Sequence, residues 1–170
     1  MIAYVSAGTV GTGSTSVTPG LPASLATGDG VLIMVVTKPD TAIINTPAGW
    51  THIATVAGGG GTTGSAVGPT KQSWFFREKD ATWSTMPAIS VTSGSGSAAI
   101  ATRWTKAVGT DWNLAASTAA YGTSATVTNA SVAHGSNPGL TSGDAVAVGY
   151  SSMSITPTWS AQSVTAAGAT

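Results

Sequence analysis

The chain of 170 residues contains no cysteine and few charged side chains. Without cysteine it can form neither disulfides nor thiolate metal sites, so packing and backbone hydrogen bonds must stabilise the fold. Charged residues make up 7% of the chain, and six acidic side chains balance six basic ones. Because the six lysines and arginines are scattered along the sequence, they predict no basic patch, and we exclude nucleic acid as a partner.

Side chains that carry catalysis or bind metals are also scarce. The two histidines, His52 and His134, lie far apart, whereas zinc sites usually take at least two closely spaced ligands. Glu78 is the only glutamate and lies between a lysine and an arginine, as in a charged strand end rather than a pair of catalytic carboxylates. The Gly-x-Ser-x-Gly motif of serine hydrolases is missing. We therefore predict a protein that is not an enzyme and has no catalytic residues, bound metal or cofactor.

Long apolar runs and helical patterns are absent as well. The apolar run 31–36 is far shorter than the ~20 residues of a membrane helix. The first four residues lack the positive charge that begins a signal peptide, so we expect a soluble protein that does not contact membranes. Glycine, serine and threonine interrupt every segment, and no window shows a 3.6-residue period with a cap. The class predicted is all-β.

Strand signals are abundant. Short runs of Val, Ile, Thr, Phe and Trp recur about every ten residues between Gly, Pro, Asn and Asp. The strands expected are 2–6, 14–18, 31–37, 50–56, 71–78, 88–92, 98–106, 122–132, 145–151 and 159–165. Residues 31–36 are apolar on both faces, as expected of a central strand covered on both sides. Short strands joined by Gly and Pro turns predict a jelly-roll-like antiparallel β-sandwich.

The chain also repeats part of its own sequence. The segment 25–31, which contains a Gly-Asp pair, returns as residues 140–146, and the Thr-Pro element before Trp50 returns before Trp159. We expect one domain over residues 1–170, built from half-repeats at roughly 14–106 and 122–170. The second copy stops soon after its tryptophan, so we expect a neighbouring subunit to complete the sheet, unless the sequence is cut.

The repeated motifs have a structural interpretation. In each Gly-Asp pair, Gly28 or Gly143 supplies the positive φ of a tight turn, and the aspartate bonds the backbone two residues on. The proline before each tryptophan marks the start or edge of a strand, and the tryptophan packs inward. Trp50 and Trp159 are therefore predicted to be buried counterparts in the two half-repeats.

The aromatic residues carry the one binding hypothesis, because tryptophan on a β-surface can stack on sugar rings or anchor a protein interface. Trp83 and Trp112 lie in polar, loop-like surroundings and are predicted to be the most exposed tryptophans. With Asp111 they form the candidate set of contacts to a partner or glycan, although core or interface packing is the favoured role. Asp111 also begins a calcium-like pattern, but Ala115 and Ala116 replace a ligand and the turn glycine.

The order of these motifs resembles that of β-rich structural proteins of tailed phages and prophages. The resemblance rests on Gly-Asp followed by an apolar strand, Thr-Pro-Ala-Gly-Trp-Thr, a Gly-rich loop, the Trp-Phe-Phe and Ala-Ala-Ile-Ala-Thr-Arg-Trp strands, and the second Gly-Asp. It implies a non-enzymatic virion component, assembled in the host cytoplasm, in contact with copies of itself and with a major capsid or tail protein. The near-zero net charge, which gives little repulsion between copies, also favours an assembly.

Within that resemblance, a short chain suits a capsid decoration or cement protein better than a long fibre. The alternative is a carbohydrate-binding or adhesin module of a tail or fibre. A third, weaker interpretation is an enzyme whose active site is shared between subunits, which the scarcity of histidine and glutamate disfavours.

Overall fold

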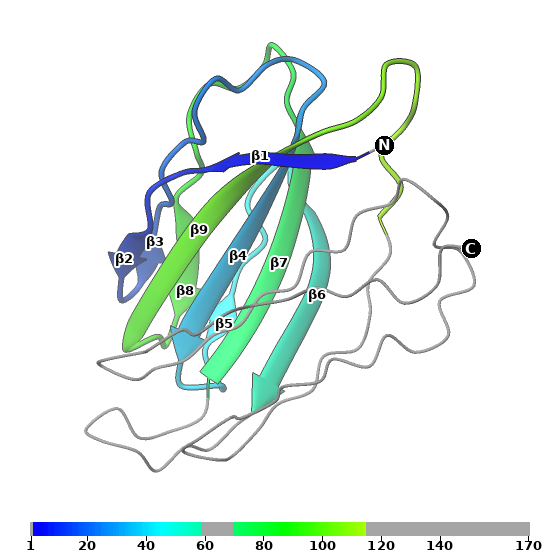
Figure 1. Ribbon diagram of the computed structural model, residues 1–170. Helices are drawn as coiled ribbons and strands as arrows, with labels where there is room; N and C mark the ends of the chain where they lie inside the picture. The colour runs from blue at the N-terminus through cyan, green and yellow to red at the C-terminus, as the bar shows by residue number, and fades with distance from the viewer. Residues whose placement is uncertain (1, 59–69, 115–170) are drawn as a thin grey trace, which may run out of the picture.

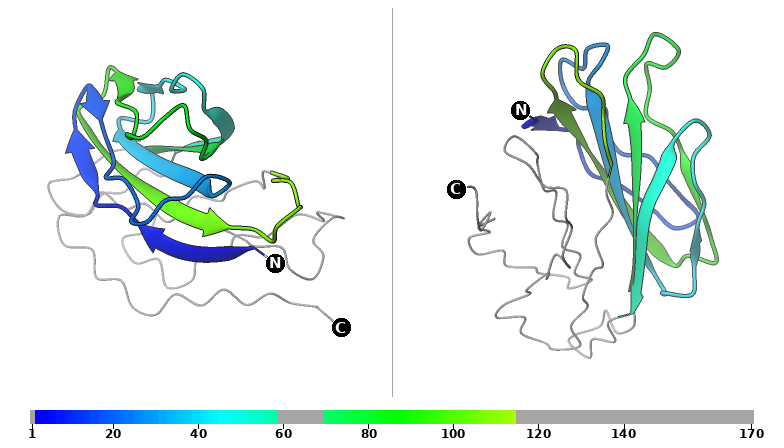
Figure 2. Two further views of the ribbon diagram at one scale, coloured as in Figure 1. Left: turned by 90° about the horizontal axis from the view of Figure 1, so that it is seen from above. Right: turned by 90° about the vertical axis from the view of Figure 1, so that its right-hand side faces the viewer.

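The computed structural model describes residues 2–58 and 70–114, which form nine strands and no helix (Figure 1). The strands build two antiparallel sheets (Figure 2). Their buried side chains share one core. The predicted all-β sandwich is thereby confirmed. No helix in the described ranges is long and apolar enough to cross a membrane.

The larger sheet has six strands, in the order β1-β9-β4-β7-β6, with β2 also paired to β9. These strands are β1 (Ala3–Ala7), β2 (Gly11–Gly13), β4 (Gly30–Lys38), β6 (Thr51–Gly58), β7 (Thr70–Glu78) and β9 (Gly96–Thr105). The smaller sheet has the order β3-β8-β5 and consists of β3 (Ser16–Val17), β5 (Ile43–Ile44) and β8 (Ile89–Thr92).

The strand pairing is that of a jelly roll. The pairs β1–β9, β3–β8 and β4–β7 are nested along the chain, as in one long hairpin that has been rolled up. The pair β3–β8 lies in the smaller sheet, and the pairs β1–β9 and β4–β7 lie in the larger sheet, where β9 and β4 are neighbours. The predicted jelly-roll-like topology is present in this part of the chain.

The core lies between the two sheets, and β4 supplies its centre. Val31, Ile33 and Val35 alternate along β4 and are fully buried against Phe75 of β7. Ile89 and Val91 of β8 meet them from the smaller sheet. Alternate residues of a strand point to the same face, so the period-2 pattern of β4 gives the sandwich its core.

Trp50 is 8% exposed and packs in this core, as predicted. Its counterpart Trp159, the second Gly-Asp pair and the strands expected at 122–132, 145–151 and 159–165 lie outside the described residues. The half-repeat and the single domain over residues 1–170 therefore stay predictions. The seven strands expected within the described ranges are present with shifted ends, whereas β2 and β5 were not predicted.

Candidate functional site at the end of β7

The candidate site is the end of the sandwich where β7 finishes and β4 begins. The backbone N–H of Gly28 donates to the carbonyl of Lys79 at 2.8 Å, and the N–H of Lys79 donates to the carbonyl of Asp29 at 2.7 Å. These two bonds join the turn before β4 to the residues after β7. Trp83 and Trp112 both reach this junction with their indole N–H groups, as described below.

Asp29 anchors the junction. Gly28 has φ of 92°, which confirms the predicted positive φ. The Asp29 carboxylate accepts one hydrogen bond from the backbone N–H of Ala26 and one from Nε of Arg103, each at 2.7 Å. We predicted that the Asp29 carboxylate binds the backbone two residues later in the chain. That prediction was wrong, because the carboxylate instead binds the N–H of Ala26, three residues earlier, and the Arg103 guanidinium of β9. The pair thus holds the start of β4 against β9.

Most of the charge of the described residues gathers at this end. Four of the six basic side chains take part, and three of them form ion pairs: Arg103 with Asp29 at 2.7 Å, Lys106 with Glu78 at 3.4 Å, and Arg77 with Asp80 at 3.6 Å. The fourth, Lys79, donates to the backbone carbonyl of Asp80. Residues that are scattered in the sequence thus converge, but the acidic partners keep the cluster from being a basic patch.

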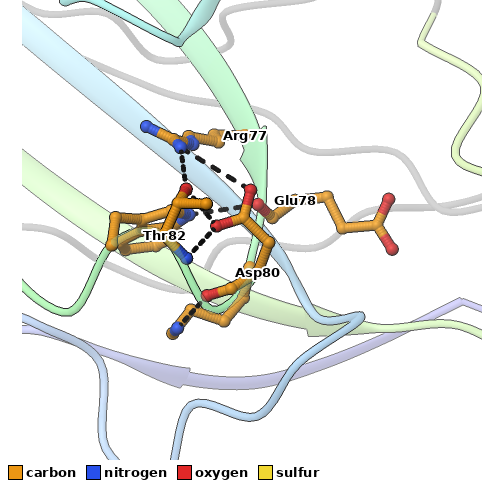
Figure 3. Close-up of polar contacts among 6 residues, drawn as sticks. Arg77, Glu78, Asp80 and Thr82 are labelled. Carbon is orange, nitrogen blue, oxygen red and sulfur yellow. Dashed lines mark hydrogen bonds and ion pairs between the residues drawn. The ribbon is translucent and has the colours of Figure 1, made fainter.

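Asp80 and Thr82 form a compact turn just after β7, shown with Arg77 in Figure 3. The Asp80 carboxylate accepts hydrogen bonds from the backbone N–H of Thr82, at 2.7 Å, and from its hydroxyl. Arg77 donates to the same hydroxyl oxygen at 2.9 Å. The bonds from Thr82, aided by the Arg77 charge, lower the pKa of Asp80 below its ordinary value.

Trp83 closes the core at this end. Its ring centroid lies 5.6 Å from that of Trp50, and its indole N–H donates to the carbonyl of Glu78 at 3.2 Å. Arg77 and Lys79 place their charged groups 5.5 and 5.1 Å from the ring centroid. Trp83, predicted to be among the most exposed tryptophans, is half-buried, because the turn after β7 folds it onto the core.

Trp112 is also half-buried. Its ring centroid lies 5.4 Å from that of Phe76, and its indole N–H donates to the carbonyl of Gly28 at 3.2 Å. A β-carbon on Gly30 would lie 2.7 Å from the Trp112 ring, so glycine makes room for it. Asp111 is exposed and forms no hydrogen bond or ion pair with the described part of the chain.

The two tryptophans lie on opposite faces of the larger sheet. Trp83 contacts Trp50, which belongs to the core between the sheets. Trp112 contacts Phe76, which is buried but lies outside that core cluster. The structure therefore brings Trp83 and Trp112 to one end of β7, but their rings do not form a single aromatic surface. Asp111 adjoins Trp112 in the chain and does not join Trp83.

Nothing in this arrangement resembles a metal centre. No group of three or more histidine, aspartate and glutamate residues within 2–58 and 70–114 is placed to hold a metal ion. His52 is exposed, and its Nε2 lies 2.8 Å from the hydroxyl oxygen of Thr55. The ion pairs and the hydrogen bonds from the indole N–H groups of Trp83 and Trp112 hold the strand ends together at this site.

The comparisons with known proteins found no match: no protein-family model, no curated protein and no solved structure is similar to the chain at the threshold of significance.

Proposed function

We propose that the protein is a non-enzymatic structural subunit of a phage virion, most simply a capsid decoration or cement protein. The observation that carries the proposal is the uncharged N-terminal edge of the larger sheet. The first 28 residues contain no charged side chain, and they supply the edge strands β1 and β2. Jelly rolls are frequent in viral capsid proteins, which supports the proposal by analogy of fold alone.

This edge offers apolar rather than ionic contacts. Val5 is 43% exposed, and Val10 and Leu21 nearby are exposed as well. Natural edge strands are commonly guarded by lysine or proline, but β1 and β2 contain neither. The register shift between Tyr4 and Ser6 is the one irregularity along β1. In the proposed role, this surface contacts other copies of the chain and the major capsid or tail protein, without nucleic acid or membrane.

The test is a salt wash of native particles that carry the protein. Apolar contacts should survive a rise from about 0.1 to 1 M NaCl, because salt screens exposed charges and leaves neutral contacts intact. The variant Val5→Lys should lower the occupancy of the particle, whereas Ser90→Lys, an exposed position in the other sheet, should not. Release of the wild-type protein in this salt range, or a chain that attaches to no virion surface, would refute the proposal.

The second candidate is a carbohydrate-binding or adhesin module. The supporting observation is that Trp112 is half-buried beside the exposed Asp111, and jelly rolls also occur in lectins. Against it, Lys106 lies 5.6 Å from the Trp112 ring centroid and competes for the ring face. Binding of the wild-type chain to a glycan array, lost in Trp112→Ala but kept in the control variant Trp104→Ala, would favour this function over the first.

We also propose that the protein has neither hydrolase activity nor a metal requirement. Elemental analysis of the purified chain checks the second point directly. A transition metal bound in a one-to-one ratio, or turnover of a peptide, ester or glycoside substrate, would contradict the non-enzymatic assignment.

A further inference from the structure

The larger sheet has a second apolar face, directed away from the smaller sheet. We call it the outer face. Along β4 it carries Leu32 and Met34, which alternate with the core residues Val31, Ile33 and Val35. The register places neighbouring strands beside them, so that the outer face comprises Tyr4, Leu32, Met34, Val36, Trp74, Phe76, Ala98, Ile100 and Trp104.

No charged side chain interrupts the middle of this face. Across β4, the neighbours of Met34 are Trp74 and Ile100, and those of Leu32 are Phe76 and Thr102. Tyr4 and Trp104 continue the aromatic surface with ring centroids 5.6 Å apart. A sheet apolar on both faces is typical of a sheet covered on both sides, and the smaller sheet covers only the core face.

The same chain already begins to cover the outer face. After β9 the backbone turns at Gly109, with φ of 79°, and Trp112 lies on the outer face against Phe76. A β-carbon on Gly30 would be only 2.7 Å from the Trp112 ring, and the indole N–H is fixed to the carbonyl of Gly28. The chain after Leu114 therefore starts from this face.

We propose that residues 115–170 of the same chain dock on the outer face. These 56 residues contain one charged side chain, Asp144, so they match a neutral surface and lack the charge that keeps a free tail solvated. Their sequence is strand-like at 122–132, 145–151 and 159–165. The inference does not depend on the proposed function, because it concerns the chain by itself.

Thiol labelling of the full chain tests whether the outer face is covered. The chain has no cysteine, so Met34→Cys introduces a unique thiol at the centre of the face. Ser90→Cys, at an exposed position of β8 in the smaller sheet, is the control outside the outer face. We expect the thiol at position 34 to react at least about tenfold more slowly than the control, at a rate independent of protein concentration. Equal rates would overturn the proposal.

Photo-crosslinking identifies what covers the face. The photoreactive p-benzoylphenylalanine replaces Met34 in the full chain, and Ile100 in a second variant that guards against a local packing defect. We expect crosslinks within one chain to peptides from residues 115–170, and no such crosslinks from the same probe at Ser90 of the smaller sheet. Crosslinked dimers would assign the face to a second copy, crosslinks to another protein would assign it to that partner, and either result would refute the proposal.

Discussion

Removal of the Asp29 carboxylate should destabilise the whole fold, because this group holds β4 against β9. The side chains of Asp29 and Arg103 are 9% and 14% exposed. In Asp29→Ala the N–H of Ala26 and Nε of Arg103 both lose their acceptor. Breaking one side of a buried ion pair costs about 3–5 kcal/mol. Because the pair is partly solvated, we expect a loss of about 3 kcal/mol, which lowers Tm by roughly 6–12 °C in a chain of this size.

Urea and thermal unfolding, followed by circular dichroism, measure this loss. Asp111→Ala is the matched control and should change the free energy of unfolding by less than about 0.5 kcal/mol, because Asp111 is exposed. The double variant Asp29→Ala/Arg103→Leu should lose less free energy of unfolding than the sum of the losses in the two single variants, because it leaves no buried charge unpaired. Strict additivity, or an Asp29→Ala variant as stable as wild type, would refute the anchoring role.

Three further outcomes are expected. Trp50→Ala should cost ~3–5 kcal/mol in urea unfolding, because it leaves a cavity in the core, and an unchanged Tm would contradict its burial. In an NMR titration, the pKa of Asp80 should lie below 3.8, and Thr82→Val should raise it towards that value. Because folding lowers the pKa of Asp80, this carboxylate stabilises the fold at pH values above its unfolded pKa, and the stabilisation is lost as the pH falls through its folded pKa. A carboxyl that titrates at its ordinary value would argue against the Thr82 bonds. Asp144→Ala should cost less than Asp29→Ala in urea unfolding, because residues 115–170 contain no arginine to pair with it, and an equal cost would contradict this.

The long strands were predictable because their signal is local. β4 is a continuous apolar run and β7 contains a Trp-Phe-Phe run, each bounded by Gly, Pro or Asp, and their observed ends differ from the predicted ones by one residue at most. β2 and β5 have three and two residues, too few for a period to show. In β2, Gly11 is needed because a β-carbon there would lie 2.0 Å from the carbonyl oxygen of Thr18, a contact formed only when the chain doubles back.

The candidate site shows the same division. The turn at Gly28 was predictable, since a tight turn before an apolar strand favours glycine with positive φ. The partner of Asp29 was not, because Arg103 lies 74 residues away and meets it only through the pairing of Val31 with Arg103 across β4 and β9. Arg103 shares a face of its strand with Ala99 and Ala101, and this charge beside small apolar residues was the one signal in the sequence that an acidic partner was needed.

The sequence by itself determined the class of fold, the positions of the long strands and the burial of Trp50, because these depend on residue spacing within one segment. Tertiary structure decided which strands became neighbours, how the scattered charges paired, and why Trp83 and Trp112 are half-buried rather than exposed. The physical reason is range: alternation and turn chemistry act over a few residues, whereas a hydrogen bond or a ring contact between distant residues forms only after the sheet has fixed the register of its strands.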